Sequence, residues 1–282
     1  MPPAIQAARL QREPRTPFLV DGVRVGSVAD AHLPALAAWP QWVGRRAAGT
    51  HPDAVELRVV PGEREQALDA MNDALRAQGL IRAWRDERFA LFDPADGRVL
   101  ATFERASARF WGTLTLGAHC NGYVAGPDGR PTHLWIAQRS ATKATDPGLH
   151  DNFIGGGVPH GQTPLRTVIR EGWEEAGLRP ADMAGLAPGR VIELDRDVPE
   201  GRQFERLHVF DLALAPDVQP CNQDGEVAAL ACLPLAQAAE IALSPTMTVD
   251  AALVTLDFLL HWQALPAALH ARVEAGMQAL WA

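Results

Sequence analysis

The chain has 282 residues, with 26 Lys and Arg against 34 Asp and Glu, which gives a formal net charge of −8. Neither this balance nor any run of basic residues suits a protein that coats nucleic acid, because duplex phosphates require clustered positive charge. A hydrophobic fraction of 47% and a charged fraction of 21% are typical of a folded globular protein and exclude an intrinsically disordered chain.

The N-terminal segment and the cysteines bear on location. Residues 1–17 are rich in proline and arginine and have no apolar run of the length that a signal peptide needs. Nothing later approaches the roughly 20 apolar residues of a membrane span. Three widely spaced cysteines, Cys120, Cys221 and Cys232, support neither a disulfide framework nor a zinc site. We expect a disordered leader over 1–17 and a cytoplasmic protein that binds no membrane.

Residues 18–103 have the pattern of a small α+β domain. Runs of β-forming residues alternate with one amphipathic run that ends before Gly79, and turn residues such as Asp21-Gly22 separate the strands. The predicted elements are a hairpin over 18–28, a strand over 54–60, a helix over 63–78 and strands over 88–92 and 98–103.

Residues 104–282 have the pattern of a larger α/β domain. Thr163-Pro164 is a typical helix start, and Gly177 is a typical stop, so the sequence predicts a helix over 164–176. A long polar loop over 139–161 precedes it. One mixed sheet flanked by helices is expected, with strands over 112–125, 132–138, 189–194 and 207–214 and helices over 234–243, 249–262 and 267–280.

The helix over 164–176 carries a cluster of carboxylates. At 3.6 residues per turn, Glu171, Glu174 and Glu175 share one face, opposite an apolar stripe. Neighbouring carboxylates repel one another, so a hard divalent cation, Mg²⁺ or Mn²⁺, is their natural partner. Arg170 can orient a carboxylate, and the turn Gly155–Gly157 lets backbone atoms approach a metal or phosphate. The alternative interpretation is a solvated helix face.

These residues resemble the Nudix box, the signature of the Nudix hydrolase superfamily. Two positions depart from it: Gln162 replaces the first glutamate, and Gly172 replaces a larger apolar residue. The lost charge at Gln162 suggests fewer or weaker metal ions. At Gly172 we expect a close approach of helix and sheet, with Trp173 filling the flank. The positions that match are Gly156, Arg170, Glu171, Glu174, Glu175, Gly177 and Leu178.

Further segments resemble one branch of that superfamily, the Nudix domain fused to thiamine pyrophosphokinase in fungi. In that branch a domain of uncharacterised function precedes the Nudix domain. The resemblance implies an α/β/α sandwich with a mixed sheet, preceded by a small α+β domain, and it also makes Gln162 a trait of the branch. The segments that carry it are 117–123, 139–143, 147–152 and 224–227.

The resemblance also implies an activity, the Mg²⁺-dependent attack of water on a diphosphate. Thiamine pyrophosphate or its oxidised analogues are the implied substrates, and nucleoside diphosphates are the alternative. Glu171, Glu174 and Glu175 would ligate the metal or activate water, and the Gly155 carbonyl would add a ligand. Glu226, with Asp224 behind it, is the candidate for a further catalytic acid.

Candidate substrate-binding residues lie before the helix. Lys143 and Arg139 are placed to meet the diphosphate, or are two surface charges. His119 and Asn121 have the same parity on a strand and face one side, as pocket or as core residues, while Cys120 faces the other. Gly156 and Gly157 offer backbone groups to the phosphates. Trp111 and Trp135 are candidates for stacking on a heteroaromatic ring, or are simply core.

Two other functions stay open at this point. A protein that binds or senses a diphosphate without cleaving it is compatible with Gln162. Isomerisation of a prenyl diphosphate would need a cysteine beside the metal, and Cys120 should face away. The expected partner is a small-molecule diphosphate, with a homodimer as an open option.

Overall fold

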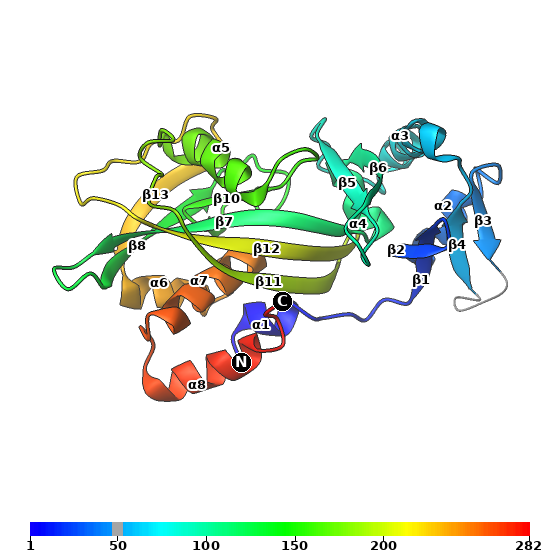
Figure 1. Cartoon of the computed structure of the whole chain (residues 1–282). Helices are drawn as coiled ribbons and strands as arrows, with labels where there is room; N and C mark the ends of the chain where they lie inside the picture. Colours follow the sequence, from blue (N-terminus) through cyan, green and yellow to red (C-terminus); the bar gives the residue numbers. More distant parts are fainter. Residues whose placement is uncertain (47–52) are drawn as a thin grey trace.

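A seven-stranded mixed sheet dominates the computed structural model, which describes residues 1–46 and 53–282 (Figure 1). Strand β12 runs parallel to β7, and every other pair in the sheet is antiparallel. Five strands follow the order β11 (Ala187–Val198), β12 (Gly201–Ala213), β7 (Leu114–Ala125), β8 (Pro131–Arg139) and β13 (Val227–Pro234), while β10 (Ile154–Gly157) pairs with β7 and β9 (His150–Asp151) with β8.

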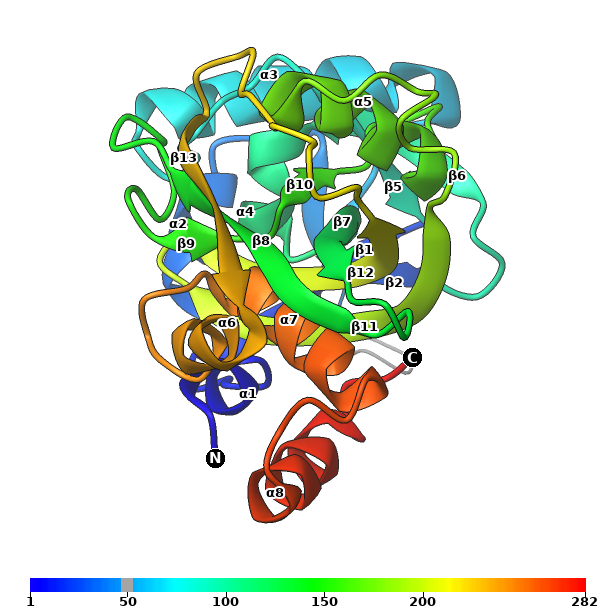
Figure 2. The same cartoon turned by 90° about the vertical axis from the view of Figure 1, so that its left-hand side faces the viewer.

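Helices cover both faces of this sheet, which confirms the α/β/α arrangement (Figure 2). Helix α5 (Pro164–Ala176) packs on β10 and β7, while α7 (Val249–His261) lies on the opposite face beside α6 (Leu235–Ala242). Helix α8 (Ala267–Met277) packs on α7. No helix in the described ranges is long and apolar enough to span a bilayer.

The bounds of α5 follow from local chemistry. The Thr163 side chain accepts a hydrogen bond from the Arg166 N–H, and Gly177, at φ +67°, ends the helix as predicted. Gly172 fits closely, because a Cβ there would lie 2.4 Å from the Met183 sulfur. The expectation for Trp173 is wrong: its side chain is 51% exposed, since it lies on the flank that faces solvent rather than the sheet.

The N-terminal segment is ordered, so the prediction of a disordered leader is wrong. Helix α1 (Pro3–Ala7) packs against α7, with Ala4, Ile5 and Ala8 buried. Beyond it the chain follows β11, where the Asp195 and Asp197 N–H groups donate to the carbonyls of residues 8 and 10. The high proline and arginine content suggested disorder, but the segment also has a short apolar face that packs into the core of the larger domain.

The N-terminal domain contains a second sheet and its own core. Its four strands lie in the order β2 (Val23–Ala29), β1 (Arg15–Val20), β4 (Ala54–Leu57), β3 (Val43–Arg46), and β5 (Arg88–Phe92) pairs with β6 (Val99–Glu104). The elements predicted at 18–28, 63–78, 88–92 and 98–103 are present within a few residues. The helical segments are η1 (Asp30–His32), α2 (Leu33–Leu36), η2 (Pro61–Glu63), α3 (Arg64–Ala77), η3 (Arg105–Ser107) and α4 (Ala108–Trp111).

Trp111 belongs to this N-terminal core rather than to a binding site. Its ring centroid lies 4.6 Å from that of Phe18, and its Nε1 donates to Asn72. The predicted stacking role of Trp111 is therefore wrong. Because Ala108 and Phe110 are buried in the same core, this unit continues past residue 103.

Candidate active site

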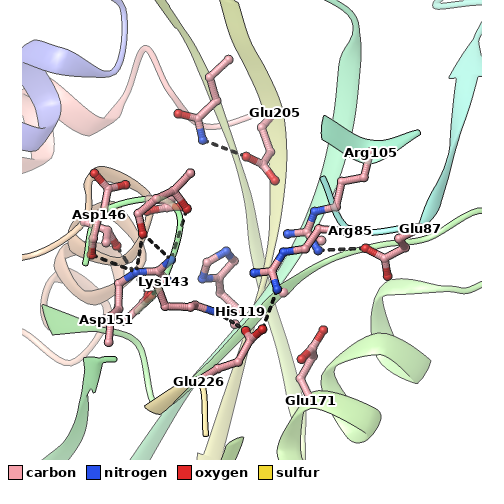
Figure 3. Close-up of a pocket in the computed structure, with 18 of the residues that line it drawn as sticks. Arg85, Glu87, Arg105, His119, Lys143, Asp146, Asp151, Glu171, Glu205 and Glu226 are labelled. Carbon is pink, nitrogen blue, oxygen red and sulfur yellow. Dashed lines mark hydrogen bonds and ion pairs between the residues drawn. The ribbon is translucent and has the colours of Figure 1, made fainter. Parts of the chain in front are cut away.

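A cavity of about 320 Å³ lies where the two domains meet (Figure 3). Helix α5 and strand β10 form one side, and the N-terminal domain contributes side chains next to them, with Arg105 beside Gly157. Charged side chains make up most of its lining. The cations are Arg85, Arg105, Arg109, Arg139, Lys143, Arg170 and Arg196, and the acids are Glu87, Asp146, Asp151, Glu171, Glu174, Glu205, Asp224, Glu226 and Asp250.

The acidic wall is formed by Glu171 and Glu174 of α5 and the glycines of β10, which line the cavity, together with Glu175, which is buried and does not itself line it. Arg170 bridges two of these acids: its Nη2 lies 2.7 Å from Glu171 Oε1 and its Nη1 lies 2.6 Å from Glu174 Oε2. Glu175 is buried and accepts the Gly155 N–H at 2.8 Å. The structure thus places these three side chains along one edge of α5 beside β10, where Arg170 and the Gly155 N–H hold their oxygens.

The glycine run permits these contacts by lacking side chains. A Cβ on Gly156 would lie 2.1 Å from Glu171 Oε1, and one on Gly155 would lie 2.8 Å from the Nδ1 of His119. A Cβ on Gly157 would lie 2.6 Å from the Phe89 ring. Close approach, not turn geometry, is what requires three consecutive glycines here.

Burial makes the acidic wall electrostatically costly. Desolvation, reinforced by the Glu174 charge, raises the pKa of Glu171 to about 7 against the opposing effect of Arg170. Burial, followed by repulsion from Glu171, raises the pKa of Glu175 well above its usual range. A positive charge placed among these carboxylates would relieve both effects.

The atoms of the acidic wall that could bind a metal suit a hard divalent cation. They are carboxylate and carbonyl oxygens, which Mg²⁺ and Mn²⁺ prefer. In the part of the chain that the structure describes, no three Asp, Glu, His or Cys side chains converge as a preformed ligand set. Arg170 and the Gly155 amide instead hold the carboxylate oxygens.

Glu226 lies across the cavity between two cations (Figure 3). Its Oε1 is 2.6 Å from Arg85 Nη1, and its Oε2 forms an ion pair with Lys143. Asp224 accepts the Glu226 N–H at 2.8 Å and supports the loop. Burial, and then the nearby Arg139 charge, lower the pKa of Lys143 to about 8. Lys143, a predicted substrate-binding residue, and Glu226, the predicted further acid, thus both line the cavity and form an ion pair with each other.

Arg139 also lines the cavity, but its guanidinium is occupied by the chain itself. It forms an ion pair with Asp151 at 2.6 Å and donates to the carbonyls of Thr145 at 2.8 Å and Asp146 at 3.2 Å. These bonds brace the loop between β8 and β9. The structure therefore gives Arg139 a loop-holding role and leaves few of its donors for a diphosphate.

His119 and Asn121 have different surroundings. His119 lines the cavity and contacts Asn152 Oδ1 through Nδ1 at 3.0 Å. Asn152 Nδ2 donates to the Ala251 carbonyl, so the amide atom that faces His119 is the oxygen. His119 Nδ1 is therefore the donor in the contact between the two side chains. The prediction of Asn121 as a pocket residue is wrong, because its side chain is 1% exposed, does not line the cavity and donates to Asp211 at 2.9 Å.

Three further expectations concern residues outside the lining. Gln162 accepts a hydrogen bond from the Thr167 hydroxyl at the start of α5 and does not line the cavity. Cys120 is fully buried on the other face of β7, as predicted from its parity. Trp135 packs near Phe153, with ring centroids 6.0 Å apart, so its predicted stacking role is wrong.

Several lining residues were missed by the sequence analysis. Arg85, Glu87, Arg105 and Arg109 come from the N-terminal domain. No motif marks any of them, because Arg85 and Glu87 lie in a short charged loop and Arg105 and Arg109 lie in short helical turns. The larger domain adds Arg196, Gln203 and Glu205 from β11 and β12 and Asp250 from α7.

Comparison with known proteins gives consistent findings for both domains. Residues 119–255 match the family model described as the NUDIX domain, and residues 3–115 match a domain of unknown function, DUF4743. "Nudix hydrolase 20, chloroplastic" of Arabidopsis thaliana is 33% identical over 255 residues, which cover 86% of this chain and 67% of the relative.

A second relative and a solved structure extend the comparison. "Nudix hydrolase 24, chloroplastic" of Arabidopsis thaliana is 36% identical over 204 residues, which cover 71% of this chain and 54% of the relative. This chain thus spans between about half and two thirds of these relatives. The crystal structure of a C. elegans Ap4A hydrolase binary complex matches 54% of this chain and 99% of that chain, with 17% identity and a TM-score of 0.40.

Proposed function

Because this chain belongs to the Nudix hydrolase family, we propose that it hydrolyses the diphosphate linkage of a small organic diphosphate with the help of a divalent metal ion. The observation that carries the proposal is a single cavity in which the Glu171 and Glu174 carboxylates face a set of arginines. Carboxylates suit the metal, and guanidinium groups suit phosphate oxygens.

The residues divide the chemical work between them. Glu171, Glu174, Glu175 and the Gly155 carbonyl would hold the metal. When bound, Mg²⁺ or Mn²⁺ neutralises charge on the diphosphate and makes a water molecule more acidic. Arg170 fixes the orientation of two of these glutamates. The water oxygen attacks one phosphorus, the bond from that phosphorus to the bridging oxygen breaks, and the Glu226 carboxylate accepts the proton of the water.

The lining bears on the organic part of the substrate. Within the described ranges, no Phe, Tyr or Trp side chain lines the cavity. Recognition of the group attached to the diphosphate therefore depends on hydrogen bonds and charge, supplied by residues such as Gln203, Thr248 and Asp250. We propose thiamine pyrophosphate, its oxidised analogues and nucleoside diphosphates as candidate substrates. Their aromatic rings would have no Phe, Tyr or Trp side chain to stack on among the described lining residues.

The alternatives have less support. The hypothesis of a protein that binds a diphosphate without cleaving it was based on Gln162, which replaces a glutamate. The Gln162 side chain lies outside the cavity, so this replacement takes no carboxylate away from the lining. The isomerase alternative required a cysteine beside the metal, and Cys120 is buried in the core away from the cavity.

Phosphate release by the full chain, measured with Mg²⁺ or Mn²⁺ over a panel of thiamine, nucleoside and sugar diphosphates, tests the proposal. Glu174→Gln keeps the side-chain shape and removes one charge, and it should lower kcat by about 10²–10³-fold on the best substrate. Glu240→Gln, on the exposed face of α6, is the matched control and should leave kcat unchanged. Failure of the wild-type protein to turn over any member of the panel would contradict the proposal.

A further inference from the structure

The N-terminal domain reaches the cavity through a small set of charged side chains. Arg85 and Glu87 precede β5, Arg105 follows β6 and Arg109 lies in α4. We propose that this domain supplies the phosphate-binding wall of the active site and that Arg105 is its main phosphate-binding residue. The inference rests on the proposed function, and it assigns a role to a domain whose family description states none.

Arg105 is held in place from several directions. Its Nη1 forms an ion pair with Glu87 Oε2 at 2.8 Å, and its guanidinium lies over the Phe89 ring at 5.3 Å from the centroid. A guanidinium that is oriented in advance loses less conformational entropy when it binds a ligand.

The buried carboxylate of Glu104 organises the backbone around this wall. It accepts the N–H groups of Arg85 at 3.0 Å, of Glu87 at 3.2 Å and of Ala106 at 3.1 Å. One carboxylate therefore fixes the two chain segments that carry the wall, the segment before β5 and the turn after β6. The phosphate-binding wall is a built feature of the N-terminal domain rather than a chance group of surface charges.

Arg105 faces the acidic wall at short range. A Cβ on Gly157 would lie 3.2 Å from its Nη2, so the guanidinium rests against the glycine run beside the metal site. Its charge acts on Glu171, whose pKa it lowers against the larger effect of burial. A diphosphate bound to a cation on α5 would therefore meet Arg105 next.

Arg105 also retains open hydrogen-bond donors, in contrast to the three lining cations that the chain itself occupies. Arg170, Arg139 and Lys143 are occupied by carboxylates or carbonyls of the chain. Neither the Nε nor the Nη2 of Arg105 donates to a described residue, and its side chain is 34% exposed. Two open donors on one planar group match the non-bridging oxygens of a phosphate.

The test compares Arg105→Ala and Arg105→Lys with Arg98→Ala in the full chain. Arg98 lies in the same domain, is 60% exposed and does not line the cavity, so it is a matched control. We expect Arg105→Ala to lower kcat/KM by about 10–100-fold, mainly through KM, because a ground-state phosphate contact is lost. Arg105→Lys should lower kcat/KM less than Arg105→Ala does, since lysine retains the charge but not the forked donors. Arg98→Ala should have the kcat/KM of the wild type.

A binding measurement separates this inference from the proposed hydrolysis. Calorimetry with methylenediphosphonate and Mg²⁺, a probe with no hydrolysable bridge, should give at least about tenfold weaker binding to Arg105→Ala than to the wild type. If the wild type binds the probe but hydrolyses nothing, the hydrolase proposal fails while weaker binding by Arg105→Ala still supports the wall. If the Arg105 variants turn over substrate and bind the probe as Arg98→Ala does, or if the wild type does not bind the probe, the wall is overturned. Arg105→Lys decides the matter if Arg105→Ala does not fold.

Discussion

The two walls of the cavity hold opposite charges by different means. On the acidic wall, three glutamates lie within five residues of one helix, and burial raises the pKa of Glu171 and Glu175. On the phosphate-binding wall, Arg85 and Arg105 are only partly buried, and each is paired with an acid that leaves some donors open. The first wall stores electrostatic strain that a cation relieves, while the second is already neutralised and offers directional hydrogen bonds.

The geometry of the acidic wall is the most sensitive part of this comparison. Gly156→Ala places a methyl carbon 2.1 Å from Glu171 Oε1, so the carboxylate must move. We expect kcat on the best diphosphate substrate to fall by about 10²–10³-fold, since small displacements of catalytic groups have effects of this size. Steady-state kinetics measure it. Gly62→Ala, which meets no atom within 4 Å, is the control, and wild-type kcat in Gly156→Ala would show that Glu171 needs no such close fit.

The stability cost of buried carboxylates can be tested outside the acidic wall, at Asp211. Burial raises the pKa of Asp211 to about 6, against the opposing hydrogen bond from Asn121. A raised folded-state pKa leaves stability unaffected below the unfolded value near 4 and lowers it increasingly up to about pH 6. Asp211→Asn should keep the hydrogen bond and raise the free energy of unfolding at pH 7 by about 1–3 kcal/mol.

Urea unfolding of the wild type and Asp211→Asn at several pH values measures this difference. The two proteins should converge near pH 4 and diverge up to about pH 6. Asp217→Asn serves as the control, because Asp217 is exposed and forms no ion pair with a described residue. A constant difference between Asp211→Asn and the wild type at all pH values would show that packing, rather than the buried charge, is responsible.

Salt should distinguish the walls by a smaller effect. The arginines of the phosphate-binding wall are partly exposed and are therefore screened, because the Debye length falls from about 14 Å to about 4 Å between 0.05 and 0.5 M salt. We expect kcat/KM of the wild type to fall by a factor of about 3–10 over this range. Arg105→Ala should show a weaker dependence. If kcat/KM depends equally on salt in the wild type and in Arg105→Ala, the charge that attracts the diphosphate lies elsewhere in the cavity.

Local signals in the sequence predicted the acidic wall and its helix. Thr163, Pro164 and Gly177 fix the ends of α5 through contacts within a few residues. The 3.6-residue period alone places Glu171, Glu174 and Glu175 near one another. The leader was mispredicted because Ala4 and Ile5 become a buried face only when α7 is present to receive them.

The remaining parts of the site depend on long-range contacts. Asn121 has the same parity on β7 as His119 but is buried and does not line the cavity, since parity gives the side of a strand on which a residue lies and not how deeply that residue is buried. By itself the sequence determined the carboxylate helix and the glycine run, because spacing along one element encodes them. The predicted loop over 139–161 is partly wrong, since it contains β9 and β10, whose pairing with β8 and β7 is a long-range contact. Only the tertiary structure decided which arginines face those carboxylates, because Arg85 and Arg105 reach them through the packing of a separate domain.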